Sequence, residues 1–138
     1  KKENISKSNY AIFLEAIKDI GSDYYATQIL SSLMEKDMDE NSLTNFLNLV
    51  RTNIGSDYYA ATLYKKVSKN DDLTERQLKI ILKSAGESVS SSSYLSSILS
   101  ELAPKVKKGS ESLKQEYLKV AKKIRSDSYF GKAMKAIY

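Results

Sequence analysis

The chain has 138 residues, a length that suits one domain, and it carries a net charge of +5. Hydrophobic residues make up 41% of it and charged residues 28%, the balance of an ordinary soluble globular protein. It contains no cysteine and no histidine, which excludes disulfides, thiolate metal sites and any mechanism that needs an imidazole. We therefore expect a single domain over residues 1–138, with no metal and no cofactor.

The N-terminal residues Lys1-Lys2-Glu3-Asn4 lack an initiator methionine and the apolar core of a signal peptide. No apolar run of the chain approaches the ~20 residues that a helix needs to cross a bilayer. The sequence therefore predicts a mature or excised segment that does not insert into a membrane.

The first helix is predicted over residues 8–19. There Tyr10, Phe13, Leu14 and Ile17 recur at the spacing of one helix face.

A seven-residue motif, Ile-Gly-Ser-Asp-Tyr-Tyr-Ala, comes after this helix and is repeated along the chain. It starts at Ile20 and again at Ile54, returns in a looser form at Val89, and appears a last time at Ile124. Successive starts are 34, 35 and 35 residues apart. A fixed period in the range of about 20–50 residues is typical of proteins whose repeat units bury their apolar faces against one another.

Each motif is predicted to open a helix, and a second helix is expected before the next motif. The apolar residues after each motif keep the same helical phase. The motif helices are expected over residues 25–33, 59–67, 94–102 and 129–137, and the apolar faces of the intervening helices over residues 43–50, 78–85 and 113–121.

The third motif helix lies in a stretch that composition alone would assign to a flexible linker, because residues 88–100 contain eight serines. Yet Leu95, Ile98 and Leu102 keep the phase of the two earlier motif helices. A linker has no reason to keep that register. We therefore predict a helix with a serine-rich face that Pro104 ends, followed by a turn.

Two helix starts are predicted from capping boxes, in which a Ser or Thr side chain and a Glu or Gln three residues later satisfy free backbone N–H groups. Thr74 and Gln77 form the first of these pairs, and Ser112 and Gln115 form the second.

Together these elements predict an all-α fold, an α-solenoid of about eight helices in stacked antiparallel pairs with a period of 34–35 residues. The architecture expected is of the HEAT and armadillo type, since the tryptophan and glycine of the TPR consensus are missing. The last motif helix has no second helix after it. Its outer flank should be exposed, or covered by something outside this sequence.

The Ser-Asp pair of the motif suits the start of a helix. A serine at the N-cap accepts a hydrogen bond from a free N–H, and the aspartate beside it faces the positive end of the helix dipole. The alternative is a row of carboxylates, Asp23, Asp57 and Asp127, that binds a cationic peptide. Ser92 interrupts this row.

The motif tyrosines fall into two classes. One position is a tyrosine in every unit, and we expect it to pack between helices with its hydroxyl on a partner; its members are Tyr25, Tyr59, Tyr94 and Tyr129. The other holds Tyr24 and Tyr58 but becomes Ser93 and Ser128 later, so it is not a core position. Amphipathic aromatic residues dominate binding hot spots. The predicted partner-binding residues are therefore Tyr24, Tyr58, Asp23 and Asp57.

Positive charge is concentrated in the last third of the chain. Residues 105–138 hold ten Lys or Arg and three Asp or Glu, a net of +7, whereas residues 1–104 hold twelve and fourteen, a net of −2. Such an end could bind a polyanion such as nucleic acid or heparin. A solvated face is the competing interpretation, because lysine rather than arginine supplies the charge. The residues of this alternative site are Lys105, Lys107, Lys108, Lys119, Lys122, Lys123 and Arg125.

Other chemistry finds little support. Asp37, Asp39 and Asn41 match the first positions of a calcium loop, but its sixth position is Ser42 and its twelfth is Asn48, where glycine and glutamate are required. No Ser-x-x-Lys motif and no glycine-rich phosphate loop occurs. We expect no enzymatic activity.

The motif at Ile20, Ile54 and Ile124, with its weaker copy at Val89, resembles a helical-repeat segment of bacterial proteins. Segments of this kind are associated with extracytoplasmic regions of antirepressor-type membrane zinc metallopeptidases and with uncharacterised bacterial proteins. Without histidine this chain cannot carry the zinc site of such a peptidase. The resemblance implies an accessory sensor or interaction region in a periplasmic or extracytoplasmic location, although the residues alone leave a cytoplasmic one open.

The function predicted from the sequence is that of a non-catalytic module that binds a protein or peptide. The alternative is polyanion binding through the lysine-rich last third. The oligomeric state is left open.

Overall fold

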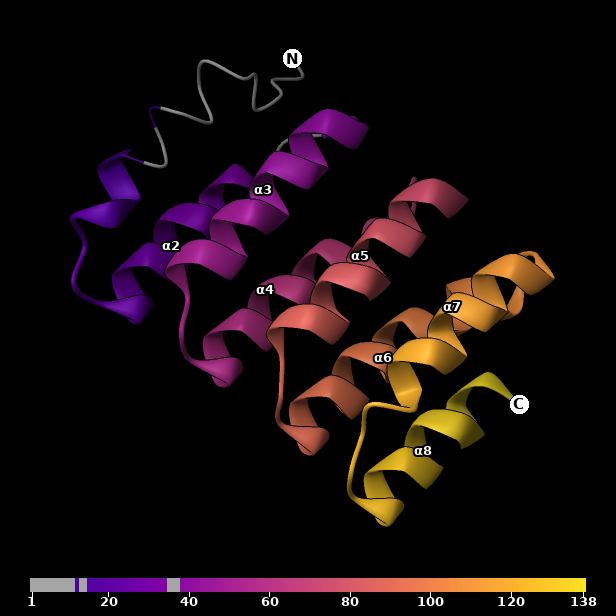
Figure 1. The fold of residues 1–138 in the computed structure, drawn as a ribbon. Helices are drawn as coiled ribbons and strands as arrows, with labels where there is room; N and C mark the ends of the chain where they lie inside the picture. The colour runs from indigo at the N-terminus through magenta and orange to yellow at the C-terminus, as the bar shows by residue number, and fades with distance from the viewer. Residues whose placement is uncertain (1–11, 13–14, 35–37) are drawn as a thin grey trace.

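The computed structural model describes residues 12, 15–34 and 38–138, and these residues form helices joined by short connections, with no strand among them (Figure 1). Residues 15–18 are helical and lie in the segment predicted as the first helix. The all-α prediction is therefore confirmed. The complete helices are α2 (Asp23–Leu33), α3 (Glu40–Asn53), α4 (Asp57–Ser68), α5 (Glu75–Ser88), α6 (Ser92–Lys107), α7 (Glu111–Ala121) and α8 (Asp127–Ile137).

The helices lie in two rows, and neighbours along the chain are in contact. The motif helices α2, α4, α6 and α8 contact one another in that order and form the motif row. The helices between them, α3, α5 and α7, do the same and form the partner row (Figure 1). Each helix therefore packs on its chain neighbours and on the adjacent helices of its own row.

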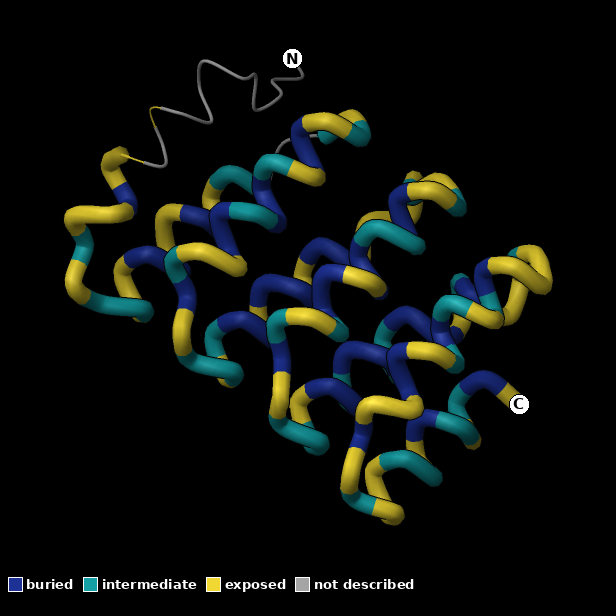
Figure 2. The backbone as a smooth tube through the Cα atoms, in the orientation of Figure 1, coloured by how far each residue is buried: buried dark blue, intermediate teal, exposed yellow. Residues whose placement is uncertain are grey.

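The core fills the space between the two rows, where Figure 2 shows the buried backbone of both rows facing inward. Leucine, isoleucine, valine and alanine supply most of it. The residue that opens each motif also lies at the base of this core, because Ile54, Val89 and Ile124 are buried and Ile20 is half-buried. These branched side chains seal the connection that leads into each motif helix.

Two tyrosines lie fully inside the core, and both find a partner for the phenol group. The hydroxyl of Tyr64 is 2.6 Å from Ser84 Oγ and donates to Ser88 Oγ at 3.2 Å, which joins α4 to α5. The hydroxyl of Tyr117 donates to the carbonyl of Ala133 at 2.6 Å, which joins α7 to α8. Burial raises the pKa of both phenols above the ordinary value of 10.

The serine-rich segment is helical as predicted, since α6 begins at Ser92, but the prediction that Pro104 ends the helix is wrong. The helix continues to Lys107 with Pro104 inside it. Leu102 and Val106 on either side of the proline are fully buried. Burying Val106, which comes after the proline, contributes roughly 1.5–3 kcal/mol, which offsets much of the loss of about 3 kcal/mol that a proline causes inside a helix.

The first capping box is confirmed and the second is wrong. Gln77 N donates to Thr74 Oγ1 at 3.1 Å, and Thr74 N donates to Gln77 Oε1 at 2.9 Å. Helix α7 instead takes Ser110 as its N-cap, two residues before the predicted one. Ser112 accepts a hydrogen bond from the Lys79 ammonium at 2.7 Å.

Every complete helix of the described part is too short or too polar to span a bilayer.

Candidate functional site

The serines of the motif cap their helices as predicted. Ser22, Ser56, Ser91 and Ser126 are the N-caps of the motif row, and each hydroxyl accepts from the backbone N–H three residues later. Four helices that begin in the same way present their first turns at the same edge of the molecule (Figure 1).

In α2, α4 and α6, the residue after the N-cap reaches across to the next motif helix, which the sequence did not indicate. Asp23 Oδ2 accepts from Gly55 N at 3.1 Å and from Ser56 N at 2.8 Å. Asp57 Oδ2 repeats both bonds, with the same distances, to Ser90 N and Ser91 N. The two amides that lead into α4 and the two that lead into α6 are thereby bound to the start of the preceding motif helix. We call this pair of bonds the relay.

The relay continues where serine replaces aspartate. Ser92 Oγ lies 3.3 Å from both Arg125 N and Ser126 N, which donate to it. The bonds are longer because a hydroxyl carries no charge, whereas a carboxylate makes shorter, charge-assisted bonds. Ser92 breaks the row of carboxylates but keeps the contact between the helices.

The partner row has a similar pair of bonds between α5 and the start of α7. Ser110, the N-cap of α7, donates from its backbone N to Glu75 Oε1 at 3.0 Å and from its hydroxyl to Glu75 Oε2 at 2.5 Å. These bonds from Ser110 lower the pKa of the Glu75 carboxyl.

Asp23 and Asp57, predicted to bind a partner, are half-buried, and one oxygen of each is engaged inside the molecule. Their first role is therefore structural. Contact with a cationic peptide stays a prediction for the remaining carboxylate oxygen.

Four exposed tyrosines and one half-buried tyrosine form a continuous line across the first turns of three motif helices. The ring centroids of Tyr24 and Tyr59 are 6.2 Å apart, and those of Tyr58 and Tyr94 are 6.0 Å apart; each of these contacts joins two helices edge to face. Adjacent rings within α2 and within α4 meet at 5.2 and 5.1 Å. We call this line the tyrosine ladder; its members are Tyr24, Tyr25, Tyr58, Tyr59 and Tyr94.

The division of the tyrosines into packed and exposed classes is half right. Tyr24 and Tyr58 are exposed, as expected, at 48% and 55%. Of the class expected to be packed, Tyr59 is half-buried and packs against the core, but Tyr25 at 63%, Tyr94 at 36% and Tyr129 at 38% are exposed. In the first turns of α2, α4 and α6, rings from neighbouring helices pack on one another at the surface.

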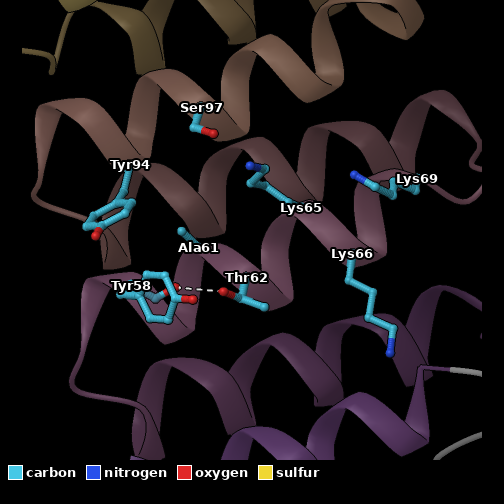
Figure 3. Close-up of a pocket in the computed structure, with 8 residues that line it drawn as sticks. All are labelled: Tyr58, Ala61, Thr62, Lys65, Lys66, Lys69, Tyr94 and Ser97. Carbon is cyan, nitrogen blue, oxygen red and sulfur yellow. Dashed lines mark hydrogen bonds between the residues drawn. The ribbon is translucent and has the colours of Figure 1, made fainter. Parts of the chain in front are cut away.

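Next to the ladder, a groove of about 350 Å³ runs between α4 and α6. Tyr58 and Tyr94 close one end of it, and lysines extend along the other (Figure 3). Thr62 lies between the tyrosine end and the lysine end, and its hydroxyl donates to the Tyr58 carbonyl at 3.0 Å, as the dashed line shows. The full lining is Tyr58, Ala61, Thr62, Lys65, Lys66, Lys69, Tyr94 and Ser97.

The groove is electropositive. Lys69 binds the Glu101 carboxylate of α6 at 2.8 Å, and Lys66 donates to the Ser31 carbonyl of α2 at 3.4 Å. Lys65 has no hydrogen-bonding or ionic partner among the described residues. One carboxylate therefore already lies at the far end of the groove, and one ammonium group remains for another anion.

Sequence reasoning found Tyr58 but missed the lysines of the groove. Tyr58, Thr62, Lys65 and Lys69 recur at the spacing of one helix face, so they share the outward side of α4. Projecting each motif helix for its polar face, as well as its apolar one, would have shown this pattern.

The lysines of the polyanion alternative do not form one patch. Lys105, Lys107 and Lys108 lie around the turn between α6 and α7, whereas Lys122, Lys123 and Arg125 lie around the turn between α7 and α8. These turns are at opposite ends of α7 (Figure 1), about 16 Å apart for a helix of 11 residues. Lys119 is near the second group and contacts Glu116 at 4.0 Å.

No group of three or more metal-binding side chains occurs among the described residues. Of the calcium-loop residues, Asp39 is the N-cap of α3 and accepts from Ser42 N at 2.8 Å. Asp37 lies outside the described residues.

Comparison of the chain with protein families, curated proteins and solved structures found no significant match.

Proposed function

We propose that the chain is a non-catalytic α-solenoid of the HEAT and armadillo type that binds a protein or peptide segment. The segment lies across the tyrosine ladder and in the groove between α4 and α6. The observation that carries this proposal is a line of five tyrosines from three helices, four of which are exposed.

The solenoid part of the proposal is supported by contacts that recur with the sequence period. Asp23 bonds to Ser56, Asp57 to Ser91 and Ser92 to Ser126, at separations of 33, 34 and 34 residues. Ion pairs such as Arg51 to Glu87 and Lys69 to Glu101 also link neighbouring units. A one-dimensional repeat protein makes its contacts in this way.

The binding part is supported by residue type and position. Tyrosines bury a large apolar area on binding and lose few rotamers, which is why they dominate hot spots. An extended polypeptide segment laid over Tyr58 and Tyr94 would place its next side chains beside Lys65 and Lys69. An acidic segment fits this arrangement, because its apolar or aromatic residue would lie on the tyrosine rings and the carboxylate next to it would lie beside the ammonium groups.

A peptide-display selection on the unmodified chain tests this proposal. Selected peptides should be enriched in Asp or Glu beside an aromatic or aliphatic residue. Their affinity should fall about tenfold or more for Tyr58→Ala, an effect of at least ~1.4 kcal/mol. Tyr138→Ala is the matched control, because Tyr138 is 81% exposed and belongs to no ring contact of the ladder.

Charge reversal separates the groove from the rest of the surface. Lys65→Glu should weaken the selected peptides, whereas Lys83→Glu, on α5 in the partner row, should not. Equal binding by Tyr58→Ala and the unmodified chain, or peptides without acidic residues, would contradict the proposal. Circular dichroism of each variant confirms that it is folded.

A further inference from the structure

One member of the relay has no partner. Asp127 holds the same place at the start of α8 as Asp23 in α2 and Asp57 in α4. Its carboxylate is exposed and makes no hydrogen bond or ion pair with any described residue. Three relays already show the ligand of this position, namely two successive backbone N–H groups that lead into another helix.

The matching donors are also present, at the opposite end of the motif row. The amides of Gly21 and Ser22 correspond to those of Gly55 and Ser56. No carboxylate or other acceptor among the described residues binds them. Within the described residues, the acceptor on α8 and the pair of donors before α2 are therefore both unused.

One side of α2 is also exposed where the equivalent side of the later motif helices is buried. Ile29 is 37% exposed, although its equivalents Leu63, Ile98 and Ala133 are completely buried. The helices that carry those three side chains each contact a preceding motif helix, whereas no motif helix precedes α2 among the described residues. We call the uncovered side of α2, with Tyr25 and Ile29, the entry face.

Helix α8 presents the complementary side. Met134 is half-buried, whereas Leu30, Tyr64 and Leu99 at the equivalent position of the earlier motif helices are completely buried. Phe130 is half-buried too, although its equivalents are buried. We call this side of α8, with Asp127, Phe130 and Met134, the exit face.

We propose that the exit face docks the entry face of a second copy of this chain, head to tail. Asp127 of one copy accepts from Gly21 N and Ser22 N of the next, as the internal relays do, and the apolar side chains of the two faces cover each other. The contact continues an interface that the molecule already uses between α2 and α4, between α4 and α6, and between α6 and α8.

Helix order and charge favour this occupant. After α8, the alternation of the rows requires a helix of the partner row, and the helical residues 15–18 of the second copy hold that place. Residues 1–104 carry a net charge of −2, against +7 for residues 105–138. The basic end of one copy is therefore attracted to the rest of another copy.

Such a contact joins two different surfaces, so it produces open chains of molecules rather than a closed dimer. It uses the ends of the motif row and not the groove between α4 and α6, and it shares only Tyr25 with the tyrosine ladder. The proposal therefore does not depend on the proposed function.

Sedimentation velocity over a concentration series is the test. The unmodified chain should shift to larger species as its concentration rises towards about 1 mM, the range of a weak interface. Asp127→Ala should weaken the association about tenfold or more, since it removes two charge-assisted bonds. Glu111→Ala, which also removes an acidic residue from a helix start but on α7, should leave the association unchanged.

A mixing experiment tests the head-to-tail geometry. Ile29→Glu destroys the entry face and Met134→Glu destroys the exit face, and both side chains are already in partial contact with water. Each variant alone should be a monomer, and their mixture should give a one-to-one dimer that grows no further. A monomeric unmodified chain, association that Asp127→Ala does not weaken, or a mixture without dimers would each overturn the proposal.

Discussion

Tyrosine has two opposite roles in this molecule, and the surroundings of the phenol group separate them. Tyr64 and Tyr117 are buried, and each hydroxyl has a partner inside the core. Tyr24, Tyr25 and Tyr58 lie at the surface, where their rings contact other tyrosines of the ladder. The first pair holds helices together, and the second set leaves ring surface exposed to solvent.

The buried phenols make the protein sensitive to alkaline pH. Their pKa values are raised in the folded state, whereas in the unfolded chain they ionise near 10. Above pH 10 the unfolded chain therefore releases protons that the folded chain keeps. The stability that these groups contribute is complete below pH 10 and is lost as the pH rises.

We predict that Tyr117→Phe lowers the free energy of unfolding at pH 7 by about 0.5–1.5 kcal/mol, because the hydrogen bond to the Ala133 carbonyl is lost. The decline of stability above pH 10 should become shallower, since one group no longer titrates. Urea unfolding followed by circular dichroism between pH 7 and 11 measures both effects. The prediction would be contradicted if the free energy of unfolding declined equally steeply above pH 10 in this variant and in Tyr138→Phe.

At this scale the sequence predicted helix starts well and burial poorly. The N-cap serines can be recognised from local chemistry, because their hydrogen bonds close within three residues. A recurring Tyr25 or Tyr94, in contrast, indicates equivalent surroundings without indicating whether these surroundings are core or surface. That distinction depends on where the neighbouring helix lies.

Between elements, the relay is the feature that fixes each motif helix on the next. Its bonds replace water on two backbone amides that would otherwise be left at the open end of a connection. The sequence could not show these bonds, because the helix dipole alone already accounts for an aspartate at the start of a helix. Its spacing does not indicate that the same side chain also reaches the backbone of the next connection. The same aspartate therefore serves two helices.

Substitution of Asp57 separates these two roles. Asp57→Ala should reduce the free energy of unfolding by about 1–3 kcal/mol, because the amides of Ser90 and Ser91 lose a charged acceptor. Asp127→Ala is the matched control, since it removes an acidic residue from the same place of a helix without a relay. In dilute solution, Asp127→Ala should lower the free energy of unfolding by no more than about 0.3–1 kcal/mol, the contribution of a helix-dipole contact. That is about a third of the loss expected for Asp57→Ala.

Denaturant unfolding of the two variants side by side gives the difference. Asp57→Asn should recover part of the loss, because an amide oxygen can still accept both bonds. If Asp57→Ala and Asp127→Ala cost the same, the relay does not contribute to stability.

The helices themselves were predictable from periodicity, including the serine-rich α6, because apolar phase depends on the chain alone. The end of α6 was not. A proline marks the end of a helix only when no buried residue comes after it, and Val106 continues from Pro104 into the core.

Within the motif row, the two middle helices are the ones with a neighbouring motif helix on both sides. α4 and α6 are each flanked on both sides within the row, whereas the entry face of α2 leaves Tyr25 and Ile29 in solvent. Stability in such an arrangement is a sum of units and of contacts between neighbours. Its ends should open more readily than its centre.

Hydrogen exchange tests this gradient on matched amides. Leu30 in α2 and Tyr64 in α4 hold equivalent positions, and both side chains are completely buried. In dilute solution the amide of Leu30 should exchange about tenfold or more faster than that of Tyr64, which corresponds to ~1.4 kcal/mol. Identical protection would show that the molecule opens only as one cooperative unit.

The relay also bears on how a protein of this kind changes length. Each acceptor recognises backbone amides, not side chains, so the helix start before a connection does not discriminate between Gly55-Ser56 and Ser90-Ser91. Deleting residues 55–89 would bring Asp23 to the second of these pairs in place of the first. A gene that loses or duplicates one 35-residue period therefore preserves the seam between units.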